Sequence, residues 1–528
     1  MTPRHKKSTR LPRLCRAAAA LALVVPVFLA IPADGKGIVR IGGEPAVGVS
    51  AYELIRMADS ISRPVPPLDS ILLDETYQSL IPVDSGVSLV TWEEAGADLI
   101  RLTLSSNAVW GDAPTRVIAP DDLIRCWETR SSERWDAGWA LRGIVGVEDL
   151  SNGIEGLRAV DERTLELRLR PGAGPNAVRK ALASPALRLS NPPDAQNPDG
   201  TGPFLLEQPS SSRNRLTCAL THFAGRAYLD EVSVIAYPSA DESVLDFGRG
   251  SLDALLITSN ERSRFAESSR AVDSRTETIG EGLLVLVFNP ARLPDASGRR
   301  AFSLAVDRES IARVVLGEGA DVAADFLGSP ASAGDWESTL EEARRLLSSV
   351  HMLEDSHVDA TTGLVLLVAD DPAARAASGR LRANWESLGV PVEIRNQVGP
   401  LAVSMEADAM LLSFRVPRNG EGALPQCLAL YDRGGWWEII ALAMPPDAAS
   451  LLRSVRALDP GADLGALGSA LQSASLVVPV TRYEILFAPG PDISLVPSAV
   501  YPGTTFWRAF MGRLPETLEN QSNNGQDD

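Results

Sequence analysis

Lysine, histidine and cysteine are scarce in this sequence, and the shortages of histidine and cysteine narrow the classes of protein to which it can belong. The 528 residues contain only four lysines, four histidines and four cysteines, and no C-x-x-C pair occurs. Without clustered Cys and His, haem or metal binding has little support, and we expect no cofactor and no metal. The chain also lacks H-E-x-x-H, G-x-S-x-G, a Walker loop and G-x-G-x-x-G before a helix, so we expect no enzyme activity.

Positive charge is in short supply as well. The sequence has 50 basic and 68 acidic residues, a net charge of −18. Six of the basic residues fall within residues 1–33, which hold no acid, and their removal would take the net charge to −24. Such a surface repels phosphate backbones, so we expect no nucleic-acid partner.

Long apolar runs are absent except near the start of the chain. Residues 17–31 (AAAALALVVPVFLAI) follow the basic residues and precede Ala33. This order predicts a secretory signal peptide over residues 1–33. An uncleaved anchor is the alternative, although the run is shorter than the roughly 20 residues that a span needs. Cys15 precedes the apolar run, whereas a lipoprotein cysteine follows it, so we expect a free periplasmic protein.

The remaining cysteines and histidines favour structural roles. Cys126, Cys218 and Cys427 are an odd number, so at least one thiol is free or pairs between chains. We interpret them as buried small hydrophobes with at most one disulfide. His222, like the other histidines of the predicted mature chain, lies in a polar segment and is expected at the surface.

Apolar periodicity predicts strands that alternate with helices, as in an α/β protein. In the helical stretch 299–316 we expect a break and a cap at Asp307, with Ile311, Val314 and Val315 facing inward. The capping box Ser-Thr-Leu-Glu predicts that a helix begins at Ser338. Strands are predicted at 38–41, 99–104, 165–169, 232–237, 283–289, 364–368, 390–394, 409–414 and 477–486, and further helices at 68–80, 120–130, 241–249 and 372–388.

Several short motifs occur in an order that resembles the family 5 extracellular solute-binding proteins of peptide and nickel importers. The most specific is residues 197–204 (NPDGTGPF), which is similar to the family's N-P-x-G-T-G-P-[YF] segment. Residues 228–232 (YLDEV) and 299–309 (RRAFSLAVDRE) resemble its later motifs. The resemblance runs through nearly the whole predicted mature chain.

This resemblance implies a bilobal periplasmic-binding-protein fold with an inserted domain. The chain would cross between the lobes near Ile279 and Val480, and these crossings would act as hinges. The implied bounds are residues 36–66, 197–278 and 480–515 for lobe one, 67–196 for the inserted domain, 279–479 for lobe two, and 516–528 for a disordered tail.

The ligand site is where this chain departs from the family pattern. Many relatives carry G-W-x-A-D-Y-P-D-P after a strand of lobe two, but residues 413–422 read SFRVPRNGEG here. A buried arginine in this stretch could hold a carboxylate bidentately, or the stretch could be a solvated rim. Trp436 and Trp437 could floor a binding cleft, or one could pack in the core and the other be exposed. The candidate ligand-binding residues are therefore Phe414, Arg415, Arg418, Glu421, Trp436 and Trp437.

Two functions follow from the resemblance. The first is a monomeric, non-enzymatic receptor of an ABC importer, which closes on an oligopeptide or similar small solute and delivers it to a permease in the inner membrane. The second is a family-derived sensor or scaffold protein that has lost transport, an alternative that the altered segment 413–422 keeps open.

Overall fold

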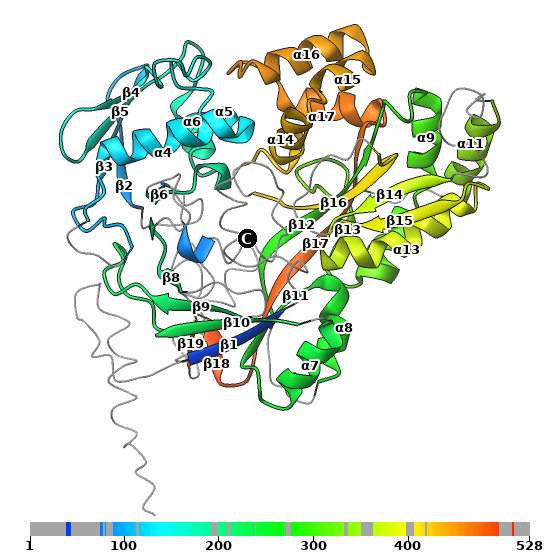
Figure 1. The fold of residues 1–528 in the computed structure, drawn as a ribbon, viewed down its shortest axis with the longest axis horizontal. Helices are drawn as coiled ribbons and strands as arrows, with labels where there is room; N and C mark the ends of the chain where they lie inside the picture. Colours follow the sequence, from blue (N-terminus) through cyan, green and yellow to red (C-terminus); the bar gives the residue numbers. More distant parts are fainter. Residues whose placement is uncertain are drawn as a thin grey trace, which may run out of the picture.

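A computed structural model shows a mixed α/β protein (Figure 1). None of the helices it describes is both long enough and apolar enough to cross a bilayer. The predicted signal peptide and tail lie outside the described residues. The described residues are 38–43, 74–77, 80, 88–111, 116–191, 199–207, 213–237, 239–268, 270, 276–331, 336–349, 363–397, 406–417, 420–495 and 509–511.

One large mixed sheet occupies the centre of the molecule. Its strand order is β15-β14-β16-β12-β17-β11-β1-β10-β9-β8, with β13 paired to β17 beside this path. The strands are β1 (Ile38–Gly43), β8 (Phe204–Glu207), β9 (Arg213–Cys218), β10 (Glu231–Ala236), β11 (Ala254–Thr258), β12 (Glu277–Phe288), β13 (Ala320–Val322), β14 (Leu364–Val368), β15 (Val392–Asn396), β16 (Ala409–Arg415) and β17 (Val477–Pro489).

The long strands β12 and β17 connect the two ends of this sheet. They are antiparallel neighbours, and each also pairs with a strand of a different end. Strand β12 pairs with β16 through residues 282–288, whereas β17 pairs with β11 through residues 485–489. Figure 1 shows them running diagonally between the lower and the upper right strands. Both predicted lobe crossings fall on these two strands.

Parallel βα units build the end of the sheet that contains β14, β15 and β16. Helix α13 (Pro372–Glu386) connects the parallel strands β14 and β15, as their spacing predicted. The carboxylate of Asp371 caps α13 by accepting the N–H groups of Ala373 and Ala374. Helices α9 (Ala296–Leu304) and α11 (Trp336–Ser349) pack at this end, whereas α7 (Ala240–Gly248) and α8 (Arg262–Ala266) pack at the other.

A second, smaller body, here called the small-sheet unit, spans residues 88–191. It has its own core, which includes the buried side chains of Trp110 and Trp127. In β3, intermediate and buried residues alternate as the sequence predicted. The unit contains an antiparallel sheet of order β2-β3-β5-β4, made of β2 (Val90–Glu94), β3 (Leu99–Leu104), β5 (Thr164–Arg168) and β4 (Leu157–Ala159), with α4 (Pro120–Glu133), α5 (Trp135–Ala140), α6 (Pro175–Ala181) and the 3-10 turn η2 (Pro185–Leu187).

Four helices between β16 and β17 form what we call the helical cap. In Figure 1 they lie at the top of the molecule, beside α5 of the small-sheet unit. They are α14 (Leu424–Gly434), α15 (Trp437–Leu442), α16 (Pro446–Arg456) and α17 (Leu464–Ser473).

The stretch after α9 confirms the predicted cap at Asp307 and the predicted burial of Ile311, and it contradicts two other predictions. Asp307 caps α10 (Arg308–Ser310), because its Oδ1 accepts the Ser310 N–H at 3.0 Å. Val314 was predicted to face inward but is 79% exposed. Residues Ile311–Leu316 form a π-helical turn, whose wider period rotates side chains away from the face that an α-helix would bury. The prediction that a helix begins at Ser338 is also wrong, because α11 already includes Trp336.

His222 was predicted at the surface and is instead buried. Residues 219–229 fold back so that the Ala219 N–H reaches the Pro203 carbonyl, and the His222 ring packs on Phe223. Burial lowers the pKa of His222 to about 4, against 6.5 for an ordinary histidine. The three cysteines of the predicted mature chain are all buried and free, so none of them forms a disulfide with another.

Candidate functional site

The altered segment begins at the end of β16, where two neighbouring residues face opposite sides of the sheet. Phe414 pairs with Leu283 of β12 and is fully buried in the main core. Arg415 pairs with Gly282 and lies on the other face, and its Nε is 3.3 Å from where a Cβ of Gly280 would be. The glycine therefore leaves room for the guanidinium. The structure does not bring Phe414 to the same face as Arg415.

Arg415 belongs to a three-residue ion cluster that joins distant parts of the chain. Its Nη1 pairs with Asp74 Oδ2. On the other carboxylate oxygen, Nε and Nη2 of Arg188 donate at 2.9 and 2.7 Å. Burial alone would raise the pKa of Asp74, but the charges and hydrogen bonds of the two arginines outweigh burial, and the pKa lies below its usual value. The cluster thus links β16 of the large sheet to the end of the small-sheet unit.

Gly200 and Gly202 of the glycine motif, residues 197–204, pack on the two residues that directly follow Asp74. The Gly202 N–H donates to the Thr76 carbonyl oxygen at 2.9 Å. A Cβ at Gly200 would lie 1.9 Å from the same oxygen, and a Cβ at Gly202 would lie 2.2 Å from the Glu75 carbonyl oxygen. Only glycine permits this close backbone approach. The motif is therefore a packing surface for residues 74–76.

The predicted acid Glu421 makes a second link to the small-sheet unit, from the segment between β16 and the helical cap. It precedes α14, and its Oε1 lies 2.7 Å from Nη2 of Arg142, which follows α5. Both side chains are less than one-fifth exposed. The Arg142 guanidinium also lies over the Trp139 ring, 4.0 Å from its centroid. The predicted site residue Arg418 lies outside the described residues.

Trp436 and Trp437 are both buried, so the alternative in which one packs in the core and the other is exposed is wrong. Gly435 adopts the left-handed conformation at the end of α14, and α15 begins two residues later. This tight turn presses both rings inward. Trp436 stacks on Tyr431, whereas Trp437 meets the edge of Trp135 in α5 at a centroid distance of 5.5 Å.

Sequence reasoning missed a buried polar group beside Arg415. Tyr483 of β17 lies over Gly282, whose Cβ would be 2.2 Å from the tyrosine Cζ. The Tyr483 hydroxyl bonds to Ser413 Oγ and lies 3.5 Å from Asp371 Oδ1. The only sequence signal was Asp370-Asp371-Pro372, which predicts a helix start and nothing more.

Asp371 is fully buried, and one of its oxygens has no hydrogen-bond partner. Oδ1 accepts the two N–H groups that begin α13, whereas Oδ2 is unpartnered. Burial raises the pKa of Asp371 to about 6, although those N–H groups and the Arg375 charge oppose the rise. This carboxyl therefore gains its proton within the mildly acidic range.

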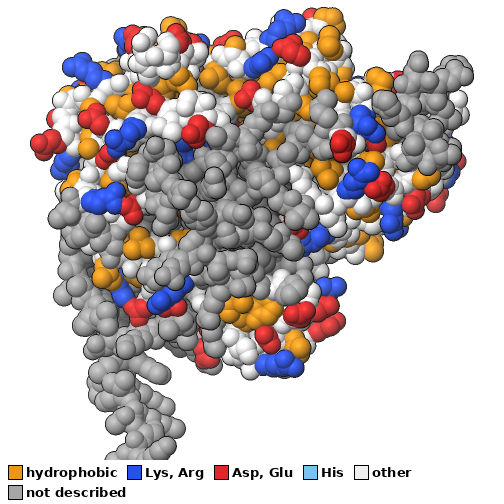
Figure 2. All heavy atoms as spheres, in the orientation of Figure 1, with side chains coloured by type: hydrophobic (Ala, Val, Ile, Leu, Met, Phe, Trp, Pro, Cys, Tyr) orange, Lys and Arg blue, Asp and Glu red, His pale blue; other side chains and the backbone are white. Residues whose placement is uncertain are grey.

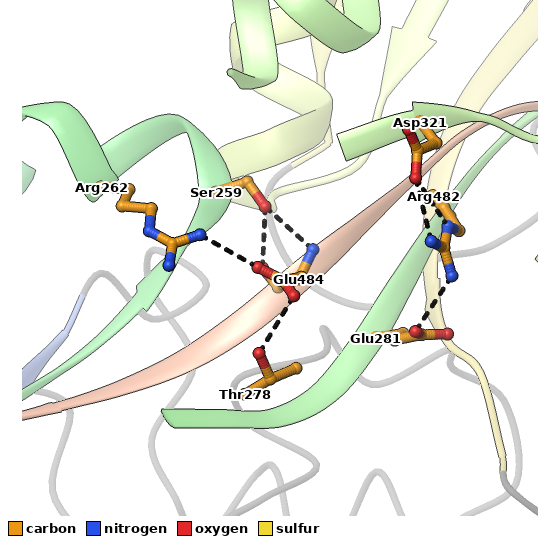
Figure 3. Close-up of polar contacts among 7 residues, drawn as sticks. All are labelled: Ser259, Arg262, Thr278, Glu281, Asp321, Arg482 and Glu484. Atoms are coloured by element: carbon orange, nitrogen blue, oxygen red, sulfur yellow. Dashed lines mark hydrogen bonds and ion pairs between the residues drawn. The ribbon is translucent and has the colours of Figure 1, made fainter. Parts of the chain in front are cut away.

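A polar network surrounds β17 where the strand passes from one end of the large sheet to the other (Figure 3). Glu484 Oε2 pairs with Arg262 Nη1 at 3.2 Å, and its Oε1 accepts the Thr278 hydroxyl at 3.0 Å. The backbone N–H of Glu484 donates to Ser259 Oγ at 2.9 Å. Glu484 thus ties β17 to β12 and to the segment that follows β11.

Arg482, on the same strand, makes the corresponding links toward the other end. Its Nη2 lies 2.9 Å from Asp321 of β13, and its Nη1 lies 3.2 Å from Glu281 of β12. The side chains in these pairs are between 30% and 52% exposed, so each pair stabilises weakly, by about 1 kcal/mol or less. Together they orient the strands without locking them.

The remaining chemistry of the described residues is sparse. They contain no group of three or more His, Cys, Asp or Glu side chains that could hold a metal ion. On the face drawn in Figure 2, acidic and basic side chains are interspersed. A field of one sign does not dominate the described part of that face. The contacts between the large sheet and the small-sheet unit are therefore the main candidate site.

Comparison with solved structures shows what fold this is. The murein tripeptide binding protein MppA of Escherichia coli matches with a TM-score of 0.70 at 15% identity, over 92% of this chain and all of that one. OppA of Haemophilus influenzae, in complex with the peptide RPPGFSPFR, matches with 0.66 at 14%, over 91% and 100%. NikA from Staphylococcus aureus, in complex with Ni(L-His)2, matches with 0.65 at 15%, over 89% and 100%.

Curated protein sequences give no match. The family profile described as bacterial extracellular solute-binding proteins, family 5 (middle) matches residues 89–413, more than half of the chain. This range contains all but the first residue of the small-sheet unit, the glycine motif, and all but the last two residues of β16. The bilobal fold of the solved relatives and this match agree with the resemblance noted in the sequence: the chain belongs to the family 5 bacterial extracellular solute-binding proteins.

Proposed function

We propose that this protein is the substrate-binding component of an ABC importer, which captures an oligopeptide or a similar small solute between its lobes and delivers it to a membrane permease. It acts as a monomer outside the inner membrane and makes or breaks no bond in its ligand. The membership of this chain in the family 5 extracellular solute-binding proteins supports the general role. The peptides and nickel chelate bound by OppA and NikA motivate the choice of solute.

One observation carries the proposal. Arg415 sits on β16 at one end of the large sheet, yet its guanidinium pairs with Asp74, and the residues after Asp74, Glu75 and Thr76, pack on the glycine motif near the other end. A ligand that touches both sides would stabilise the closed arrangement by its difference in affinity for the closed and open forms. Strands β12 and β17 are the connections about which such closure would turn.

We assign the ligand contacts to Arg415, Arg418 and Glu421, and a supporting role to the buried side chains of Phe414, Trp436 and Trp437. Arg415 would meet an anionic group of the solute, because a guanidinium matches a carboxylate in geometry and charge. The lobe bounds 36–66, 197–278 and 480–515 against 279–479, with 67–196 inserted, belong to this proposal.

The second candidate, a sensor or scaffold protein without transport, is favoured by one feature. Arg415 and Glu421 already pair with Asp74 and Arg142. A site whose charges satisfy one another in this way could serve a conformational role without a solute.

The test is to denature the purified mature protein and to identify released small molecules by mass spectrometry. Thermal shifts are then measured across a panel of peptides, sugars and metal ions. The proposal expects a bound pool or a shift of several degrees, reduced in Arg415→Met and retained in Arg395→Met. Arg395 is the matched control because its pair with Glu393 lies at an exposed position of β15. An empty protein with no shift would contradict transport and favour the second candidate.

A further inference from the structure

Helix α5 of the small-sheet unit is buried on every side. All six residues from Trp135 to Ala140 are buried. Ala137 and Ala140 belong to the core of the small-sheet unit, whereas Trp135 and Trp139 belong to the core of the large sheet and helical cap. The two tryptophans stack at a centroid distance of 5.4 Å. This short helix is therefore a seam that contributes to two cores at once.

Polar contacts reinforce the seam on the helical-cap side. The Trp135 indole N–H donates to the Arg456 carbonyl oxygen at 3.3 Å. Arg170 of the small-sheet unit donates from Nη1 to the Leu458 carbonyl oxygen at 2.7 Å. With the Arg142–Glu421 pair, three separate polar links surround the aromatic contact. Backbone carbonyls at the end of α16 thus receive donors from a segment about 300 positions earlier in the chain.

Leu458 shows that this contact is built at a local cost. Its φ is +57°, and among the described residues only Ser475 shares a positive φ without being glycine. A bulky residue in this conformation is strained, and it persists only where the surroundings hold it. The Leu458 Cδ1 lies 3.1 Å from where a Cβ of Gly138 would be, so this leucine fills the space that α5 leaves open.

We propose that the α5 seam is a ligand-independent clasp, which holds the small-sheet unit against helices α14–α16 and populates the closed form before any solute binds. The side chain of Leu458, here called the knob, packs into the space beside Gly138. Arg170 holds Leu458 in place by a hydrogen bond to the Leu458 carbonyl oxygen. Opening requires separation of Trp135 from Trp437 and loss of the surrounding polar links. The clasp itself does not depend on the proposed transport function. Only its consequence for transport, that the clasp must open before a solute can enter, rests on that function.

The test measures the distance between the two bodies in the full mature chain without added solute. Spin labels are placed at Val160→Cys and Leu442→Cys, which are 46% and 88% exposed, while the native cysteines are buried. The clasp predicts one narrow short-distance population. In Leu458→Gly, loss of the knob exceeds the relief of strain, so the open-to-closed ratio should rise about tenfold.

Two further variants keep the test decisive. Ser475→Gly relieves the other positive-φ residue away from the seam and should leave the distance distribution unchanged. Arg170→Met removes the carbonyl link without altering the knob and should broaden the distribution, which covers the case in which Leu458→Gly fails to fold. The clasp is overturned if the unliganded wild type is already open. It is also overturned if Leu458→Gly and Arg170→Met both give the distance distribution of the wild type.

The distances also separate this inference from the proposed function. A closed population that persists in protein with no ligand response supports the clasp and contradicts transport. An open protein that closes only on addition of a panel solute supports transport and contradicts the clasp.

Discussion

Replacement of Asp371 by asparagine should change the pH dependence of stability. The folded protein holds the pKa of this buried carboxyl at about 6, against 3.8 for an ordinary aspartate. Between these values the folded state binds a proton that the unfolded state has lost, so stability falls as pH rises from about 4 to about 6. A shift of this size lowers the free energy of unfolding by about 3 kcal/mol above pH 6, relative to its value below pH 4, since one pKa unit is about 1.4 kcal/mol.

The Asp371→Asn variant retains the cap of α13 and removes only the titration. The amide oxygen still accepts the Ala373 and Ala374 N–H groups, but the side chain has no proton to lose. The buried amide adds a cost of its own, which does not vary with pH. The informative quantity is therefore the change in the difference between variant and wild type from about pH 4 to about pH 8, expected to be roughly 2–3 kcal/mol in favour of the variant.

Thermal unfolding of both proteins at the two pH values measures this quantity. For a cooperative folding unit of about 200 residues, such a change should shift the gap in Tm by roughly 5–10 °C. Other titrating groups, including His222, are present in both proteins and cancel in the comparison. Asp463→Asn is the matched control, because Asp463 caps α17 at an exposed position. A gap in Tm that is the same at both pH values would refute the argument that burial sets this carboxyl apart.

Three further predictions follow from packing and burial. Gly202→Ala should destabilise the protein by about 1–3 kcal/mol or more in denaturant unfolding, because the new Cβ meets backbone. The control Gly379→Ala, which has open space around it, should stabilise α13 by roughly 1 kcal/mol, and equal effects of the two changes would contradict the packing role of the motif. His222 should reduce stability by up to about 3 kcal/mol as pH falls from about 6.5 to about 4, because the unfolded chain binds the proton first, and a His222→Asn variant that keeps this component would exclude His222 as its source. A thiol reagent should react slowly with the native mature protein and with three groups after denaturation; rapid native labelling would contradict the burial of Cys126, Cys218 and Cys427.

Local order was largely predictable from the sequence. Alternation in residues 99–104 predicted β3, Pro120 and its acids predicted the start of α4, and Asp371 before Pro372 predicted the start of α13. These signals succeed because caps, proline geometry and side-chain periodicity act within a few residues. Val314 failed for the complementary reason, since a local π-helical turn breaks the assumed period.

Sequence patterns alone were enough to identify the family, the βα order and the stretch, residues 413–422, in which the chain departs from the family's motif. The three-dimensional packing was needed to learn that Arg415 meets Asp74, that Tyr483 reaches Asp371, and that Trp437 meets Trp135. Each of these pairs joins residues more than 100 positions apart. No periodic pattern encodes such a contact, because it depends on how whole elements pack and on which glycines let backbones approach.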